Sequence, residues 1–238
     1  MPLYIAVVLS AFLAAVLVYR YDLYNRESWT MLVLAAAAGA VTMHLLAGLE
    51  LFTFGFLDGA VAGPAIGAFY EELTKLAVVA AIAVLFPKQF DDPMDGIIYG
   101  AIVGLGMGVE ESLSLLNLMA APNLLTLPVE LVRLCGHLVM GGICGFGVGI
   151  VRMRMAGWYR ALGLSFAIAF ALHFGWDWVA LSSPDGSTLS VARTFLAMGI
   201  MLLGMIVFGM MVHLGSRLSR DFFAPGSTRS LWGWPFSP

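Results

Sequence analysis

Long apolar segments alternate with short polar ones along nearly the whole chain. A membrane-spanning helix needs roughly 20 predominantly apolar residues. Seven segments meet this requirement, at about residues 3–19, 30–49, 61–86, 96–120, 128–151, 158–181 and 191–215. Because the polar stretches between them are short, the pattern predicts an all-α, polytopic transmembrane bundle of about seven helices.

The composition is that of a protein embedded almost entirely in a membrane. Of the 238 residues, 61% are hydrophobic and only 11% are charged, whereas a soluble domain carries roughly a quarter charged residues. The mean hydropathy is +0.92. The sequence has no internal repeat or linker, so we expect one transmembrane domain over residues 1–220 and an interfacial or disordered tail over 221–238. Its surroundings are then the lipid bilayer, and we expect no nucleic-acid partner.

The Lys and Arg residues gather at alternate ends of the segments. They follow the first, third, fifth and seventh segments, as Arg20, Arg26, Lys88, Arg152, Arg154, Arg160, Arg217, Arg220 and Arg229. The loops around 50–60, 121–127 and 182–190 contain neither residue type. Because Lys and Arg are enriched in cytoplasmic loops, we predict an N-terminus outside and a C-terminus in the cytoplasm.

Ionisable side chains interrupt four consecutive segments, although a charge at the bilayer centre costs at least ~2.5–3.5 kcal/mol. They are Glu71 and Glu72 in the third segment, Glu110 and Glu111 in the fourth, His137 in the fifth and His173 in the sixth. With ~1.5 Å rise per residue along alternating helices, all of them fall near one depth, ~12–15 Å below the outer surface. Intramembrane ionisable groups mark function by default, so this layer is the candidate site.

Three further charged residues lie one helical turn from members of this layer. Lys75 follows the glutamate pair of the third segment and can neutralise one of its carboxylates. Asp177 is four residues after His173, so it shares a helix face with the imidazole and can orient it. Arg133 is four residues before the histidine of the fifth segment and is a candidate auxiliary residue, as is Glu111. Each of these residues could instead serve helix packing, through a hydrogen bond or a buried ion pair.

Glycines at intervals of four residues predict close packing of the fourth and fifth segments. They are Gly100, Gly104 and Gly108 in the fourth segment and Gly141, Gly145 and Gly149 in the fifth. Small residues at this spacing let two helices approach closely. The two glycine faces would hold Glu110 and His137 near each other.

Several hydrolytic motifs are absent from the sequence, namely H-E-x-x-H, G-x-S-x-G and a pair of intramembrane aspartates. Two hydrolytic schemes remain. In the first, Glu110, His137 and His173 bind a divalent metal with an open position for water, a donor set known from catalytic zinc sites. Glu71 or Glu72 is then the general base. In the second, no metal is needed, because a buried glutamate activates water directly while a histidine stabilises the oxyanion. The sequence leaves both schemes open.

The same layer is compatible with two functions that involve no hydrolysis. A proton- or ion-coupled transporter also uses intramembrane Glu, Lys and His residues, although the chain has no repeat or pair of broken helices. A scaffold protein could use the layer only to specify helix packing. Cleavage of a single-span membrane protein, abolished by Glu72→Gln with folding intact, would favour the protease.

Three stretches and one further residue resemble the motifs of a known family. FYEELTK at residues 69–75 resembles the E-E-x-x-K motif of the PrsW family of bacterial intramembrane proteases, and FDDPMDGIIYGAIVGLGMGVEE at residues 90–111 resembles its second motif. His137 and the stretch HFGWD at residues 173–177 follow in order, so the resemblance covers about residues 65–180. Met107 stands where Phe is common and Glu111 where Asn is expected, which leaves open whether Glu110 or Glu111 faces the site.

The resemblance implies a membrane-embedded endopeptidase of a bacterial cell membrane, distantly similar to CAAX prenyl proteases and bacteriocin-processing enzymes. The residues that it implies as essential are Glu71, Glu72, Glu110, His137 and His173. Members are described as metalloproteases or metalloprotease-like, so the implied cofactor is a divalent metal. The implied substrate is a membrane protein, such as an anti-sigma factor, that is cut near its outward-facing side.

Overall fold

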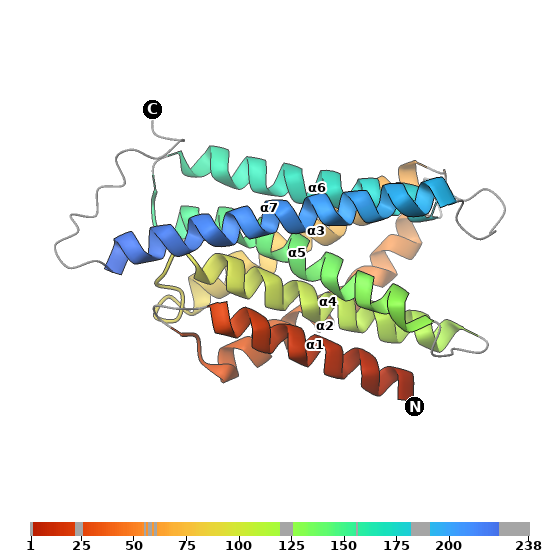
Figure 1. The fold of residues 1–238 in the computed structure, drawn as a ribbon, viewed down its shortest axis with the longest axis horizontal. Helices are drawn as coiled ribbons and strands as arrows, with labels where there is room; N and C mark the ends of the chain where they lie inside the picture. The colour runs from red at the N-terminus through yellow and green to blue at the C-terminus, as the bar shows by residue number, and fades with distance from the viewer. Residues whose placement is uncertain are drawn as a thin grey trace.

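The computed structural model contains seven α-helices and no strand within the residues that it describes, which are 2–21, 26–54, 56, 59, 61–119, 126–155, 157–181 and 191–223. The helices are α1 (Pro2–Tyr21), α2 (Trp29–Phe54), α3 (Ala62–Leu85), α4 (Asp95–Leu118), α5 (Leu127–Arg152), α6 (Trp158–Leu181) and α7 (Val191–Phe223). They run roughly along one direction, with α4 and α5 between α1 and α6 (Figure 1). The predicted all-α bundle is confirmed.

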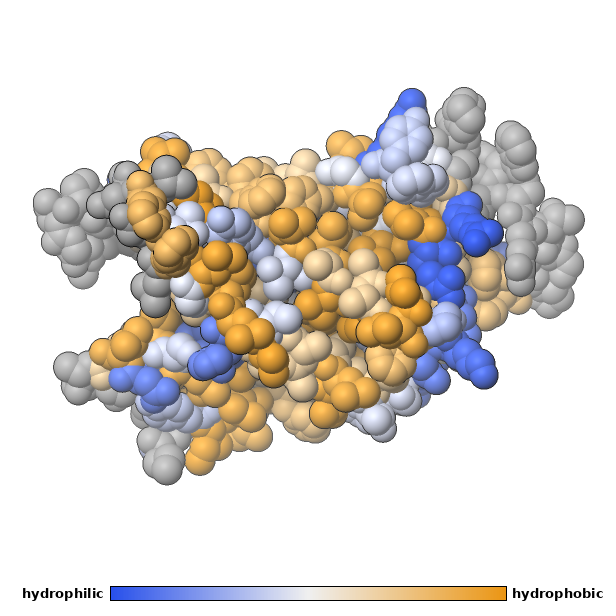
Figure 2. Space-filling model, turned by 180° about the vertical axis from the view of Figure 1, so that it is seen from behind, coloured by the Kyte–Doolittle hydropathy of each residue, from blue (hydrophilic) through white to orange (hydrophobic). Residues whose placement is uncertain are grey.

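Six of the seven helices are long and apolar enough to cross a membrane, and α3 is the exception. Every 18-residue window within α3 contains Glu71, Glu72 and Lys75, so the candidate site itself lowers the apolar character of this helix. On one face of the molecule, hydrophobic residues cover the middle while hydrophilic residues gather toward the ends, and less hydrophobic residues reach inward from one end (Figure 2). This distribution is expected of a protein with lipid around its middle.

Two helices extend further than the apolar pattern predicts. The second segment was expected to end near residue 49, but α2 continues to Phe54, which places Glu50 inside a helix. The seventh was expected to end near 215, but α7 continues to Phe223 through a polar last turn that contains Arg220. Hydropathy marks where a helix leaves an apolar environment, whereas the backbone hydrogen bonds continue beyond that point. Residues 224–238 of the predicted tail lie outside the described residues, and the orientation of the termini stays a prediction.

Glycine brings α4 and α5 into backbone contact at the centre of the bundle. A Cβ atom at Gly104 would lie 2.7 Å from the carbonyl carbon of His137 and closer still to its oxygen. Added Cβ atoms at Gly100 and Gly141 would strike each other's helix in the same way. The predicted close packing is therefore confirmed. Because the two backbones touch next to His137, side chains from α4 and α5 are held at a fixed separation there.

The segment before α4 is fixed by buried carboxylates. The Oδ2 atom of Asp95 accepts hydrogen bonds from the backbone N–H groups of Asp91 and Asp92, each 2.7 Å long. The Oδ1 atom of Asp92 accepts the N–H of Met94 at 2.7 Å and the hydroxyl of Ser219 from α7. Burial raises the pKa of Asp92 above its usual value. These bonds tie the α3–α4 connection to the last turns of α7.

Candidate active site

Helix α3 supplies two glutamates and a lysine that point into the protein. The exposed fraction is 6% for Glu71 and 0% for Glu72 and Lys75. The Nζ atom of Lys75 donates a hydrogen bond of 2.6 Å to Oε1 of Glu72 and lies 3.8 Å from Oε2 of Glu71. The three charges can occupy an apolar helix because one turn of α3 places the cation beside both carboxylates.

The two glutamates differ in how many partners they have. Besides Lys75, Glu72 accepts a hydrogen bond of 2.6 Å from Nδ1 of His173 and one of 3.5 Å from the thiol of Cys144. The Oε2 atom of Glu71 is buried and has no hydrogen-bond partner among the described residues. The Glu72 carboxylate is therefore occupied by hydrogen bonds to Lys75, His173 and Cys144. Glu71, by contrast, has an oxygen that can bind a ligand or water.

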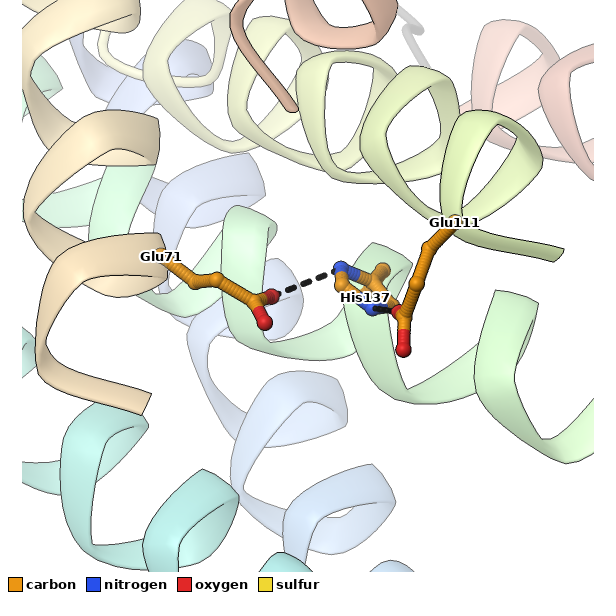
Figure 3. Close-up of side chains that lie close together, drawn as sticks. All are labelled: Glu71, Glu111 and His137. Atoms are coloured by element: carbon orange, nitrogen blue, oxygen red, sulfur yellow. Dashed lines mark hydrogen bonds and ion pairs between the residues drawn. The ribbon is translucent and has the colours of Figure 1, made fainter. Parts of the chain in front are cut away.

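His137 of α5 lies between two carboxylates from different helices, as Figure 3 shows. Its Nε2 atom is 2.7 Å from Oε2 of Glu111, and its Nδ1 atom is 3.7 Å from Oε2 of Glu71. Glu71, Glu111 and His137 can each offer one ligand atom such that all three atoms lie within 4.8 Å of one another. Within the described part of the chain, Glu71, Glu111 and His137 therefore form a group of three side chains that could hold a metal ion.

His173 and Asp177 of α6 complete the layer. The Nε2 atom of His173 lies 3.4 Å from Oδ2 of Asp177 and 3.9 Å from Oε2 of Glu71. The imidazole rings of His173 and His137 are 5.7 Å apart between centroids and meet edge to face. Helices α3, α5 and α6 thus bring together Glu71, Glu72, His137 and His173 of the predicted layer, with Asp177 beside His173.

Glu110 does not join this cluster. Its Oε1 atom forms a hydrogen bond of 2.7 Å with Nδ1 of His44 on α2 and accepts one of 3.1 Å from the hydroxyl of Ser114. Successive residues of a helix point about 100° apart, so only one of Glu110 and Glu111 can face His137. The structure places Glu111 there, and the ligand set expected from sequence, Glu110 with two histidines, does not form.

Three residues near the layer were not singled out in the sequence. His44 of α2 was not among the candidate residues, and it pairs with Glu110. Glu130 is buried and accepts a hydrogen bond of 2.5 Å from Arg133. Glu50 was expected in a loop. The Oε1 atom of Glu50 is buried, and the charges of Glu111, His173 and Asp177 act on this carboxylate. Glu50 therefore lies at the edge of the site. A longer second segment would have indicated Glu50, and the three-residue spacing between Glu130 and Arg133 would have indicated Glu130.

The donor atoms fit a divalent metal ion. The Oε2 atom of Glu71 and the Nδ1 atom of His137 are both buried, and neither has a hydrogen-bond partner among the described residues. Buried polar atoms are nearly always satisfied, so such a pair indicates a missing partner. Carboxylate oxygen and imidazole nitrogen are ligands that zinc and other divalent first-row metals accept.

Comparison with known proteins gives a consistent assignment. The model of a family described as "PrsW family intramembrane metalloprotease" matches residues 27–212. A protein named "Protease PrsW" from Geobacillus kaustophilus (strain HTA426) is 31% identical over 153 residues, which make up 56% of this chain and 67% of that relative. No solved structure matches the chain. The matched region includes every residue of the layer described above.

Proposed function

Because this chain belongs to the PrsW family of intramembrane metalloproteases, we propose that it hydrolyses a peptide bond of a single-span membrane protein at the layer of Glu71, His137 and His173. It is a multi-pass bacterial membrane protein, with six helices able to span a membrane. The observation that carries the proposal is the free, buried Oε2 atom of Glu71, which faces both imidazoles. A carboxylate in this position needs a function that outweighs the cost of its burial.

We propose Glu71, Glu111 and His137 as the residues that hold a divalent metal ion, zinc in the first instance. A bound ion of this kind supplies Lewis acidity, which makes water a stronger nucleophile and polarises the peptide carbonyl. Glu71 and Glu111 come from different helices on opposite sides of His137, so the packing of α3, α4 and α5 sets the shape of the site (Figure 3).

We assign proton transfer to His173. Its Nδ1 atom is held by Glu72, so with that nitrogen protonated, Nε2 is the acceptor for a proton from water. Asp177, 3.4 Å from Nε2, stabilises the imidazolium that results. The oxygen of water bonds to the carbonyl carbon, the C–N bond breaks, and the proton on Nε2 passes to the leaving amine. Lys75, 2.6 Å from Oε1 of Glu72, balances the charge of the Glu72 carboxylate.

A mechanism without metal uses the same residues in different roles. Glu71 itself would take the proton from water, and His137 and His173 would stabilise the developing oxyanion. Elemental analysis of active, purified protein separates the two mechanisms. The metal mechanism predicts one divalent ion per chain, lost in His137→Ala, whereas active protein free of metal would contradict it.

We propose a single-span membrane protein, such as an anti-sigma factor, as the substrate. Support comes from the family resemblance and from the position of the layer. The distribution of Lys and Arg predicts an N-terminus outside, which would put the layer in the outer half of the bilayer. A bond in the outward-facing part of a substrate span would then lie level with Glu71.

The test of this proposal is cleavage of a labelled single-span membrane protein by the purified chain in liposomes. Glu71→Gln keeps the size of the side chain and removes its charge, so it should lower the cleavage rate by a factor of about 100 or more. Glu110→Gln, one residue from Glu111 but outside the cluster, is the matched control and should cleave like the wild type. A Glu71→Gln variant that retains the wild-type rate would overturn the proposal.

A further inference from the structure

Arg133, in the second turn of α5, holds two carboxylates at once. Its Nε atom lies 3.3 Å from Oε1 of Glu111, and its Nη1 atom donates a hydrogen bond of 2.5 Å to Oε2 of Glu130. We propose that Arg133, anchored by Glu130, is a positioning residue that aims Glu111 at His137. The inference rests on the proposed function, because it assigns Arg133 a part in preparing the metal-binding group.

The two oxygens of Glu111 have different partners. Oε1 faces Arg133, while Oε2 makes the 2.7 Å contact with Nε2 of His137. A guanidinium presents its N–H groups in a rigid, planar arrangement, so the bond from Nη1 to Glu130 also sets where Nε meets Oε1 of Glu111. With Oε1 held, Oε2 is left facing the imidazole, which keeps Glu111 within the group of Glu71, Glu111 and His137.

Glu111 requires such a restraint because of its position. Its side chain is 26% exposed, the highest value in the metal-binding group. A glutamate that is partly exposed keeps much of its rotamer freedom unless another group restrains it. The Glu71 side chain, by contrast, is 8% exposed and lies within 4 Å of His137 on α5 and His173 on α6.

Glu130 explains why Arg133 itself stays in place. It is one turn before Arg133 on α5, and its side chain is completely buried. Its Oε2 atom accepts a hydrogen bond from Arg133, so a buried carboxylate holds an arginine that reaches the site. Arrangements of this kind, in which an outer carboxylate holds the group that orients a metal ligand, are known to affect metal affinity.

The experiment measures Co²⁺ and Zn²⁺ binding to the purified full chain in detergent, in competition with a chelator, and records the visible absorption of bound Co²⁺. Arg133→Gln should weaken binding about 10- to 100-fold and change the Co²⁺ spectrum. Arg133→Lys should recover only part of the affinity, because an ammonium lacks the rigid, planar set of N–H groups of a guanidinium. Arg160→Gln, an exposed arginine of α6, is the matched control and should bind like the wild type.

A double-mutant cycle on the cleavage rate tests whether Arg133 acts through Glu111. Arg133→Gln should slow the wild type but should not slow Glu111→Gln any further. Equal metal binding by the wild type and Arg133→Gln, or additive effects in the cycle, would overturn this inference alone. A wild-type protein that neither binds metal nor cleaves would overturn the proposed function, and this inference with it. If the wild type cleaves without metal, the cycle decides the role of Arg133.

Discussion

Lys75 allows a quantitative test of how the site is held together. It is completely buried and donates a hydrogen bond of 2.6 Å to Glu72, which is also completely buried. Lys75→Met would leave the Glu72 carboxylate without its cation. Breaking a buried ion pair by removing one partner costs about 3–5 kcal/mol. For a chain of this length, that loss lowers Tm by about 6–20 °C.

The double variant Glu72→Gln/Lys75→Met should be more stable than Lys75→Met alone, because the buried carboxylate closest to Lys75 is removed together with it. The assay is thermal unfolding in detergent of the wild type, both single variants and the double variant, which yields the coupling energy of the pair. Lys88→Met, an exposed lysine after α3, is the control and should change stability by less than about 0.5 kcal/mol. The reasoning is refuted if Lys75→Met is as stable as this control.

Three further predictions concern neighbouring parts of the structure. Glu111→Gln should reduce cleavage at least about 10-fold while Glu110→Gln does not, since only Glu111 touches His137. Gly104→Ala should lower stability by about 1–3 kcal/mol in thermal unfolding, because its Cβ would strike the α5 backbone, whereas Gly163→Ala has open space. The raised pKa of Asp92 means that wild-type stability falls as pH rises through that pKa; Asp92→Asn should remove this fall in melts from acidic to neutral pH.

The helices could be predicted because the apolar segments are long and the polar connections short. The layer could be predicted because the rise per residue of a helix is fixed, so residue counting gives depth. Glu71, Glu72, His137 and His173 illustrate this, since they come from three helices and meet in the structure. Depth, however, does not determine which way a side chain points around its helix.

Direction around the helix is what separated Glu110 from Glu111. The two residues lie at almost the same depth, and only the packing of α4 between α2 and α5 turns one toward His44 and the other toward His137. Glu50 was missed for a different reason. Hydropathy ended the second segment at residue 49, whereas α2 continues to Phe54 and carries Glu50 to the edge of the site.

The most direct test of the central claim is mass spectrometry of a single-span membrane protein incubated with the purified chain in H₂¹⁸O. The account predicts two fragments, with one heavy oxygen in the new carboxyl terminus and the cut bond at the depth of Glu71 in the bilayer. It also predicts that Glu71→Gln yields neither fragment. Intact substrate with the wild-type chain, or the same fragments with Glu71→Gln, would contradict the account.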